Sequence, residues 1–312
     1  MIRRPLIIAT SLLLVGAVAL LVRELGKPTP VPAPVVTADE QVPKKVRPLA
    51  RRGSVVPGLV EILSDLSLHR SRHIEAVRGL PKDLTDAELE GLVDLIRSPV
   101  PETRNPQDWY VILNEIMNVL HEPRCDIDAY RVAMAGLIQD RAANPVVRDY
   151  AAQHLTLSVK GGSSGQGLAG LPMVMETCLK IVASDEDSFE DLTGTVLLSL
   201  CSLNERLPSG ALNDYRARLG EAVIPLVSGA RKASAANRVS AIQASGRMGF
   251  TDALPAIREL ARDQDENLAV RLSSVAALGY FSRPEDRDFL KQLAESNSTL
   301  SPAAKTALQS SL

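Results

Sequence analysis

The sequence contains few aromatic residues. Phe, Trp and Tyr together make up 3% of the 312 residues, whereas hydrophobic residues as a whole make up 45%. The core must therefore consist mainly of small aliphatic side chains, which suit closely packed helices. A β-sandwich would require more β-branched and aromatic residues. The composition predicts a folded, all-α protein.

Cysteine is also scarce. The chain has three cysteines, Cys125, Cys178 and Cys201, which are widely spaced and include no CxxC pair. This pattern argues against a disulfide framework and a zinc cluster, and it leaves room for one disulfide at most, with a pairing that spacing does not define. Because no cysteine lies near the amino terminus, a lipoprotein anchor is excluded. We predict three buried thiols that act as small hydrophobic side chains.

The folded part of the chain has no excess of basic residues. Residues 53–312 contain 26 Lys and Arg against 34 Asp and Glu, a net charge of −8. Proteins that bind nucleic acid present a basic surface to the phosphates. The sequence therefore predicts no nucleic-acid partner.

The amino terminus contains an uncharged apolar run. Residues 6–22 follow a basic flank at residues 1–5 and end before Arg23. Secretory segments have apolar runs of about 7 to 15 residues and an A-x-A site, whereas a membrane-spanning helix needs about 17 to 25 residues. We predict an uncleaved signal-anchor helix over residues 6–22. The alternative is a cleaved signal and a secreted, soluble repeat protein.

Basic residues do not decide the orientation of this anchor, because they are nearly balanced on its two sides. A short amino-terminal flank normally stays in the cytoplasm. We therefore predict a single-pass membrane protein with a cytoplasmic amino terminus and an extracytoplasmic, periplasm-like carboxy-terminal domain.

Residues 23–57 form a proline-rich, basic linker. Seven prolines lie within residues 28–57, which favours an extended, semi-rigid spacer. The distal half of the linker is basic. One interpretation is that it contacts anionic lipid or an acidic surface, but we favour a solvated linker. Its basic residues are Lys44, Lys45, Arg47, Arg51 and Arg52.

Residues 58–312 contain repeated helix-start signals. Thr85 and Glu88 form a capping-box pattern, and N-cap residues precede a proline at Asn105-Pro106, Asn144-Pro145 and Ser301-Pro302. Apolar residues recur at steps of three and four, which predicts amphipathic helices. Two such sets are Trp109, Leu113, Ile116 and Leu120, and Phe189, Leu192, Val196 and Leu200.

Two segments near the carboxy terminus repeat. Arg238-Val-Ser-Ala-Ile-Gln-Ala-Ser-Gly246 and Arg271-Leu-Ser-Ser-Val-Ala-Ala-Leu-Gly279 align at a shift of 33 residues. In each segment a basic residue opens a helix, and small residues three and six positions later allow the next helix to approach closely. A second amphipathic helix follows each one. Lys305, 34 residues after Arg271, begins a last, shorter helix.

The run from Asp265 through Arg271 to Gly279 resembles the first helix of a HEAT repeat, in which an Asp is followed by an apolar-Arg pair and small residues ending in Leu-Gly. The segment around Arg148 is similar. The resemblance covers residues 235–312 clearly and residues 126–160 more weakly. It implies an α-solenoid of helical hairpins that binds protein partners along a concave face. Because 90 residues separate Arg148 from Arg238, we expect the middle of the solenoid to be irregular.

The histidines give the strongest candidate for a metal site. His69 and His73 lie one helical turn apart, a spacing that can chelate a metal, but Arg70 and Arg72 oppose a cation. The pair is therefore a weak candidate. Some HEAT-like iron hydroxylases hold two metals with several His-Glu pairs, and the single pair at His121 does not match that pattern.

No other motif predicts chemistry. The glycine-rich run at residues 161–167 lacks the Lys and the preceding strand of a phosphate loop and predicts a flexible connection. The acidic run at residues 185–191 does not match an EF-hand and is typical of a helix start. No nucleophile, base and orienting group can be assembled, so we predict no catalytic residue and no cofactor.

The leading hypothesis is a membrane-tethered, non-enzymatic scaffold that binds a protein partner through its helical repeats. The first alternative is a HEAT-like enzyme with a metal at His69 and His73. Binding of DNA in a basic groove, as in some HEAT-like repair proteins, is disfavoured by the net charge of −8.

Overall fold

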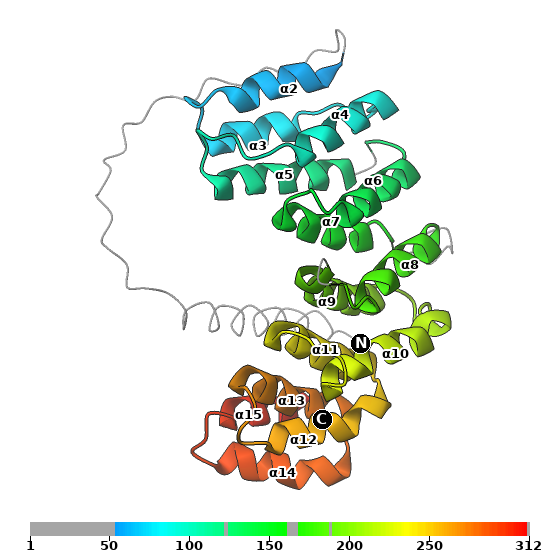
Figure 1. The fold of residues 1–312 in the computed structure, drawn as a ribbon, viewed down its shortest axis with the longest axis vertical. Coiled ribbons are helices and arrows are strands. Elements are labelled where there is room, and N and C mark those ends of the chain that lie inside the picture. Colours follow the sequence, from blue (N-terminus) through cyan, green and yellow to red (C-terminus); the bar gives the residue numbers. More distant parts are fainter. Residues whose placement is uncertain (1–53, 122–123, 161–167, 187–188, 311–312) are drawn as a thin grey trace, which may run out of the picture.

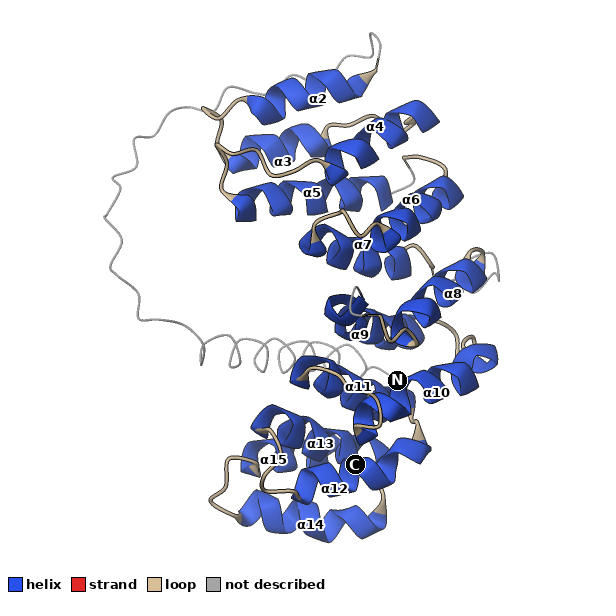
Figure 2. Cartoon of the chain, in the orientation of Figure 1, coloured by secondary structure: helices blue, strands red, loops and turns tan. Residues whose placement is uncertain are grey.

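The computed structural model describes residues 54–121, 124–160, 168–186 and 189–310, and every regular element in these ranges is helical (Figure 2). The predicted anchor at residues 6–22 and nearly all of the linker at residues 23–57 lie outside the described residues, and these predictions stay predictions. Among the described helices, none is long and apolar enough to cross a membrane. The first described helix begins at Val55, so the helical domain starts three residues before residue 58.

The helices alternate between two rows that curve together into an arc (Figure 1). The odd-numbered helices pack against one another on the inner side of the arc and are here called the inner row. The inner row consists of α3 (Arg70–Arg78), α5 (Pro106–His121), α7 (Pro145–Leu157), α9 (Glu190–Arg206), α11 (Ala235–Met248), α13 (Leu268–Phe281) and α15 (Ser301–Ser310).

The even-numbered helices form the outer row, which lies along the right edge of Figure 1 from α4 to α10. A short 3-10 helix, η3 (Thr251–Ala253), leads into α12. The outer row consists of α2 (Val55–Ser64), α4 (Asp86–Arg97), α6 (Ile127–Gln139), α8 (Leu171–Val182), α10 (Asn213–Ser228), α12 (Leu254–Arg262) and α14 (Pro284–Glu295).

The core lies between the two rows and is aliphatic, as the composition predicts. Both predicted apolar sets are buried in it, on α5 and at α9. Burying such side chains contributes roughly 1.5–3 kcal/mol each. Because every repeat shares its core with its neighbours, the domain is stabilised by contacts along the whole arc.

The helix starts follow the sequence signals, with one exception. The side chains of Thr85 and Glu88 complete the capping box, with the backbone N–H of Thr85 donating to Glu88 Oε2 at 2.8 Å. Asn105 and Asn144 accept from the second N–H of their helices. The prediction at Ser301 is wrong: α15 begins at Ser301 itself, whose hydroxyl donates to the carbonyl oxygen of Ala294 at 2.8 Å.

Arginine side chains satisfy carbonyl groups at the ends of earlier helices. Arg206 donates to the carbonyl oxygen of Thr156 in α7 at 3.1 Å, and Arg231 donates to that of Val182 in α8 at 2.6 Å. The last carbonyls of a helix have no partner within the helix and carry partial negative charge, so a guanidinium is well suited to them. These bonds tie successive repeats to one another.

The middle of the arc keeps the two-row alternation but not the 33-residue spacing. The 90 residues from Arg148 to Arg238 span two steps of the inner row, from α7 through α9 to α11. The extra length lies in the loops and in α9, which has 17 residues, whereas α11 and α13 have 14 each. The predicted irregularity is therefore one of helix and loop length.

Candidate functional site

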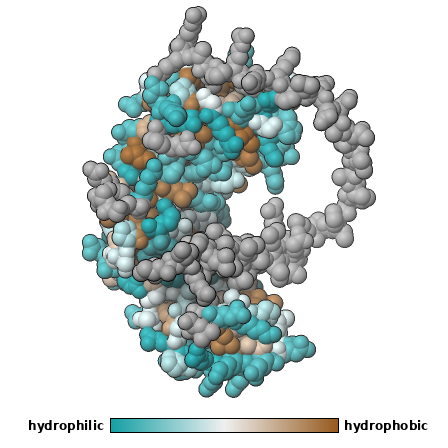
Figure 3. All heavy atoms as spheres, turned by 180° about the vertical axis from the view of Figure 1, so that it is seen from behind, coloured by the Kyte–Doolittle hydropathy of each residue, from teal (hydrophilic) through white to brown (hydrophobic). Residues whose placement is uncertain are grey.

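The open side of the inner row, here called the inner face, is the concave side of the arc (Figure 1). Several large apolar side chains are exposed on it, including Val111 at 38% and Leu157 at 38%. Seen from behind, the surface is mostly hydrophilic with separate hydrophobic patches, and the arc is open on one side (Figure 3). Such a surface offers a partner both apolar contacts and hydrogen bonds.

Polar side chains join neighbouring helices across the inner row. Arg78 of α3 pairs with Glu115 of α5 at 2.5 Å, and Arg247 of α11 pairs with Glu205 of α9 at 2.8 Å. Thr195 of α9 donates to Asp149 of α7. These charged side chains are therefore already paired within the chain.

His154 lies buried between α7 and α5. Its Nε2 atom is 2.9 Å from Oδ1 of Asn114, which assigns the proton to Nε2. Burial, followed by the nearby His121 ring, lowers the pKa of His154 from 6.5 to about 4, although Glu115 opposes the shift. The ring is therefore neutral at pH 7 and serves packing.

We expect His154 to make stability depend on pH. As the pH falls from 7 to 5, the unfolded chain binds a proton at this position and the folded chain does not, so the free energy of unfolding falls by about 2 kcal/mol. Urea unfolding at both pH values measures this, and a His154→Gln variant should lose that part of the decrease.

His73, whose pKa is also lowered, contributes in the same direction in every variant. Equal pH dependence in His154→Gln and the unmodified chain would contradict the assignment.

The candidate metal ligands His69 and His73 both have partners within the chain. His69 is the N-cap of α3, and its Nδ1 accepts from the backbone N–H of Ser71 at 3.3 Å. His73 is buried, with Nε2 3.1 Å from the carbonyl oxygen of Asp65. Burial lowers the pKa of His73, and Arg104, 3.4 Å away, lowers it further.

No group of three or more His, Cys, Asp or Glu side chains within the described ranges is placed to hold a metal. The two imidazoles are therefore not joined by a third ligand there. A metal at His69 and His73 stays a prediction.

The three repeat-signature arginines have different surroundings. Arg148 donates from Nε to the carbonyl oxygen of Ile138 at 3.0 Å and lies over the ring of Phe189. Arg238 pairs with Glu266 at 2.8 Å. The Arg271 side chain makes no hydrogen bond or ion pair with any described residue, and its Nε atom, like that of Arg238, is buried without a partner. The sequence predicts all three positions but not this difference.

The other signature residues serve packing and connection. The Asp265 side chain is exposed, and the ion pair with Arg238 is made by its neighbour Glu266. A Cβ atom on Gly246 would lie 3.3 Å from Cβ of Ala277, and one on Gly279 would lie even closer to α15. The glycines therefore permit the close approach of successive inner helices.

The three cysteines are free thiols. Cys178 and Cys201 are buried, and burial raises the pKa of each to about 12. Cys125 is half-buried, and burial followed by Asp126 and Asp86 raises its pKa to about 11. Thiols with such high pKa values are poor nucleophiles and poor metal ligands at neutral pH.

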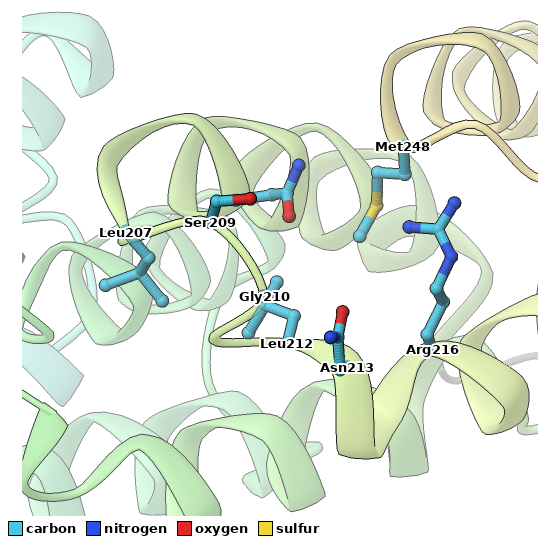
Figure 4. A pocket seen from close by; sticks show the side chains of 8 residues that line it. Leu207, Ser209, Gly210, Leu212, Asn213, Arg216 and Met248 are labelled. Atoms are coloured by element: carbon cyan, nitrogen blue, oxygen red, sulfur yellow. The ribbon is translucent and has the colours of Figure 1, made fainter.

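A polar pocket of about 430 Å³ lies where α9 ends, α10 begins and α11 ends. Asn213 and Arg216 project from α10 on the side of Met248 (Figure 4). Arg216 already donates to the carbonyl oxygen of Gly249 at 2.8 Å and lies over the ring of Phe250. The pocket offers hydrogen bonds, but its lining contains no nucleophile paired with a base. It is lined by Asn204, Leu207, Ser209, Gly210, Leu212, Asn213, Arg216 and Met248.

Residues 223–310 match the family model for HEAT repeats, and this stretch includes α11 to α15. The chain thus contains a HEAT-repeat α-helical solenoid. No curated protein matches it. A solved structure of human deoxyhypusine hydroxylase in complex with glycerol is similar over 82% of this chain and 95% of that chain, at 17% identity and a TM-score of 0.30. A likeness at this TM-score carries no inference about activity.

Proposed function

We propose that this HEAT-repeat protein is a membrane-tethered scaffold that binds a protein partner on its inner face. The observation that carries the proposal is the inner row itself, which exposes large apolar side chains on α5, α7 and α13 along a curved surface. Solenoids use such surfaces to hold extended partners. The tether is supported by the uncharged run at residues 6–22 and the proline-rich segment that follows it.

Two valines allow a matched test of the inner face. Val111 lies on α5 of the inner row, and Val132 lies on α6 of the outer row, where it is 64% exposed. Substituting each by Asp introduces the same charge on the two opposite surfaces. Because charged residues are disfavoured in the core of an interface, only Val111→Asp should weaken binding.

The experiment is proximity labelling with the full-length protein in its native membrane, with the labelling enzyme fused after Leu312. We expect one or more proteins to be labelled in the unmodified chain and in Val132→Asp, and to be lost in Val111→Asp. Labelled proteins should belong to the extracytoplasmic side. Labelling that is equal in both variants would overturn the inner face as the binding surface, and cytoplasmic neighbours would overturn the topology.

A further inference from the structure

The connection between α14 and α15 carries a three-residue motif that belongs neither to the repeat pattern nor to a helix cap. Asn297 is followed by Ser298 and Thr299, which is the pattern Asn-x-Thr with a residue other than proline in the middle. No other asparagine of the chain is followed two positions later by Ser or Thr. In exported proteins this pattern is the acceptor for N-linked oligosaccharides, and it is used in surface loops.

The fold places this motif at the surface. Residues 296–300 connect α14 to α15 at the carboxy-terminal end of the arc (Figure 1). The side chains of Asn297, Ser298 and Thr299 are all exposed. A transferase can therefore reach them without displacing a packed helix.

The two side chains that define the motif are free of partners inside the described part of the chain. The amide of Asn297 and the hydroxyl of Thr299 make no hydrogen bond with any residue in that part. The turn is closed by other groups, since the hydroxyl of Ser301 donates to the carbonyl oxygen of Ala294 at 2.8 Å. Its shape therefore does not depend on the two motif side chains, which are available to an enzyme.

Several other asparagines are committed to the fold. Asn105, Asn144 and Asn267 each accept a backbone N–H at the start of a helix. Asn114 pairs with a buried histidine. An exposed, unbonded amide with a hydroxyl two residues later occurs at Asn297 alone.

We propose that Asn297 is the acceptor of an N-linked oligosaccharide. In this transfer the amide nitrogen of Asn297 attacks the anomeric carbon of an oligosaccharide that is carried on a polyprenyl diphosphate. A C–N bond forms as the C–O bond to the diphosphate breaks, the amide nitrogen loses one proton to a base of the transferase, and polyprenyl diphosphate leaves. The hydroxyl of Thr299 is a recognition group and takes no part in the bond changes.

The inference rests on the proposed function in one respect. Asn-x-Thr motifs are modified in exported domains, and the proposed function places this domain on the extracytoplasmic side. An oligosaccharide is bulky and hydrated, so it requires a position over which nothing packs. The turn at residues 296–300 meets that requirement at the motif.

Peptide mapping of the full-length protein from its native membrane tests this site. Trypsin cuts after Lys291 and Lys305, which releases residues 292–305 as one peptide that contains Asn297. We expect this peptide to carry the added mass of a chain of sugar units, and fragmentation that preserves the sugar should assign the mass to Asn297. Asn297→Gln and Thr299→Ala should each reduce the modified fraction to background.

Two conservative variants serve as controls. Thr299→Ser keeps the hydroxyl, and Ser298→Ala leaves both defining side chains in place, so each should keep the modification. Because all three side chains are exposed, the four variants should show the helical circular dichroism of the unmodified chain. A sugar that survives in Asn297→Gln would be attached to a hydroxyl and would overturn the inference, and so would one that survives in Thr299→Ala.

The topology found by proximity labelling distinguishes failure of this inference from failure of the proposed function. An unmodified peptide in a chain whose labelled neighbours are extracytoplasmic would overturn the Asn297 site alone. An unmodified peptide together with cytoplasmic neighbours would overturn both. A peptide modified at Asn297 in a chain without labelled neighbours would support this inference and overturn the scaffold.

Discussion

An Arg258→Ala variant is expected to lose roughly 2–4 kcal/mol of unfolding free energy. Arg258 of α12 donates to both carboxylate oxygens of Asp286 on α14, at 2.7 and 2.9 Å. The Asp286 side chain is 2% exposed, so removing the guanidinium leaves a buried carboxylate without its counter-charge. Breaking a fully buried pair costs about 3–5 kcal/mol, and the 28% exposure of Arg258 reduces that figure. Urea unfolding at pH 7 measures the loss.

Arg218 and Glu176 provide a matched control for this prediction. They form a bidentate pair of the same kind between α10 and α8, at 2.6 and 2.8 Å. Both side chains are about half exposed, so water replaces the lost contact, and Arg218→Ala should lower the unfolding free energy far less than Arg258→Ala. Equal losses in the two variants would show that burial does not determine the value of these pairs.

Local signals in the sequence were sufficient for the helices themselves. The capping box at Thr85 depends on residues three positions apart, and the apolar face of α5 repeats within a single helix. Such features are set by neighbouring residues, so they can be predicted without knowing the fold. The 33-residue repeat extended the same reasoning to the packing of α11 against α13.

Long-range polar contacts could not be predicted in this way. Arg258 finds Asp286 28 positions away, and the hydroxyl of Ser301 turns back to the carbonyl of Ala294 instead of capping its own helix. In both cases the relative placement of two helices determines which group is the partner. A helix-start pattern therefore predicted the position of α15 to within one residue but not the role of Ser301.

The candidate site shows the same difference between local signals, which can be predicted, and long-range contacts, which cannot. The repeat pattern identified Arg238 and Arg271 as equivalent positions, and the structure shows that only Arg238 has a carboxylate. A comparison of Glu266 with Thr299 at the 33-residue shift could have found this difference. Leu268, Leu272, Ala276 and Tyr280 of α13 were visible in the sequence as apolar residues at steps of four, but their exposure depends on where α11 and α15 lie.

Packing along the inner row leads to the second large effect, at Gly279. A Cβ atom there would lie 2.7 Å from Cα and 2.8 Å from the carbonyl oxygen of Ala307, which are backbone atoms of α15 that cannot rotate away. Gly279→Val must therefore displace α15, and we expect a loss of about 3 kcal/mol. Hydrogen exchange should show lost protection in α15 and unchanged protection in α5.

Gly136→Val is the matched control for Gly279→Val. Gly136 lies near the end of α6 on its exposed side, and its nearest neighbour for a new Cβ is the flexible Arg97 side chain at 3.8 Å. Valine forms helix somewhat better than glycine, so this variant should stay within about 0.5 kcal/mol of the unmodified chain. If Gly279→Val were equally mild, α13 and α15 would have to be farther apart than the structure places them, and the close approach attributed to the repeat glycines would be wrong.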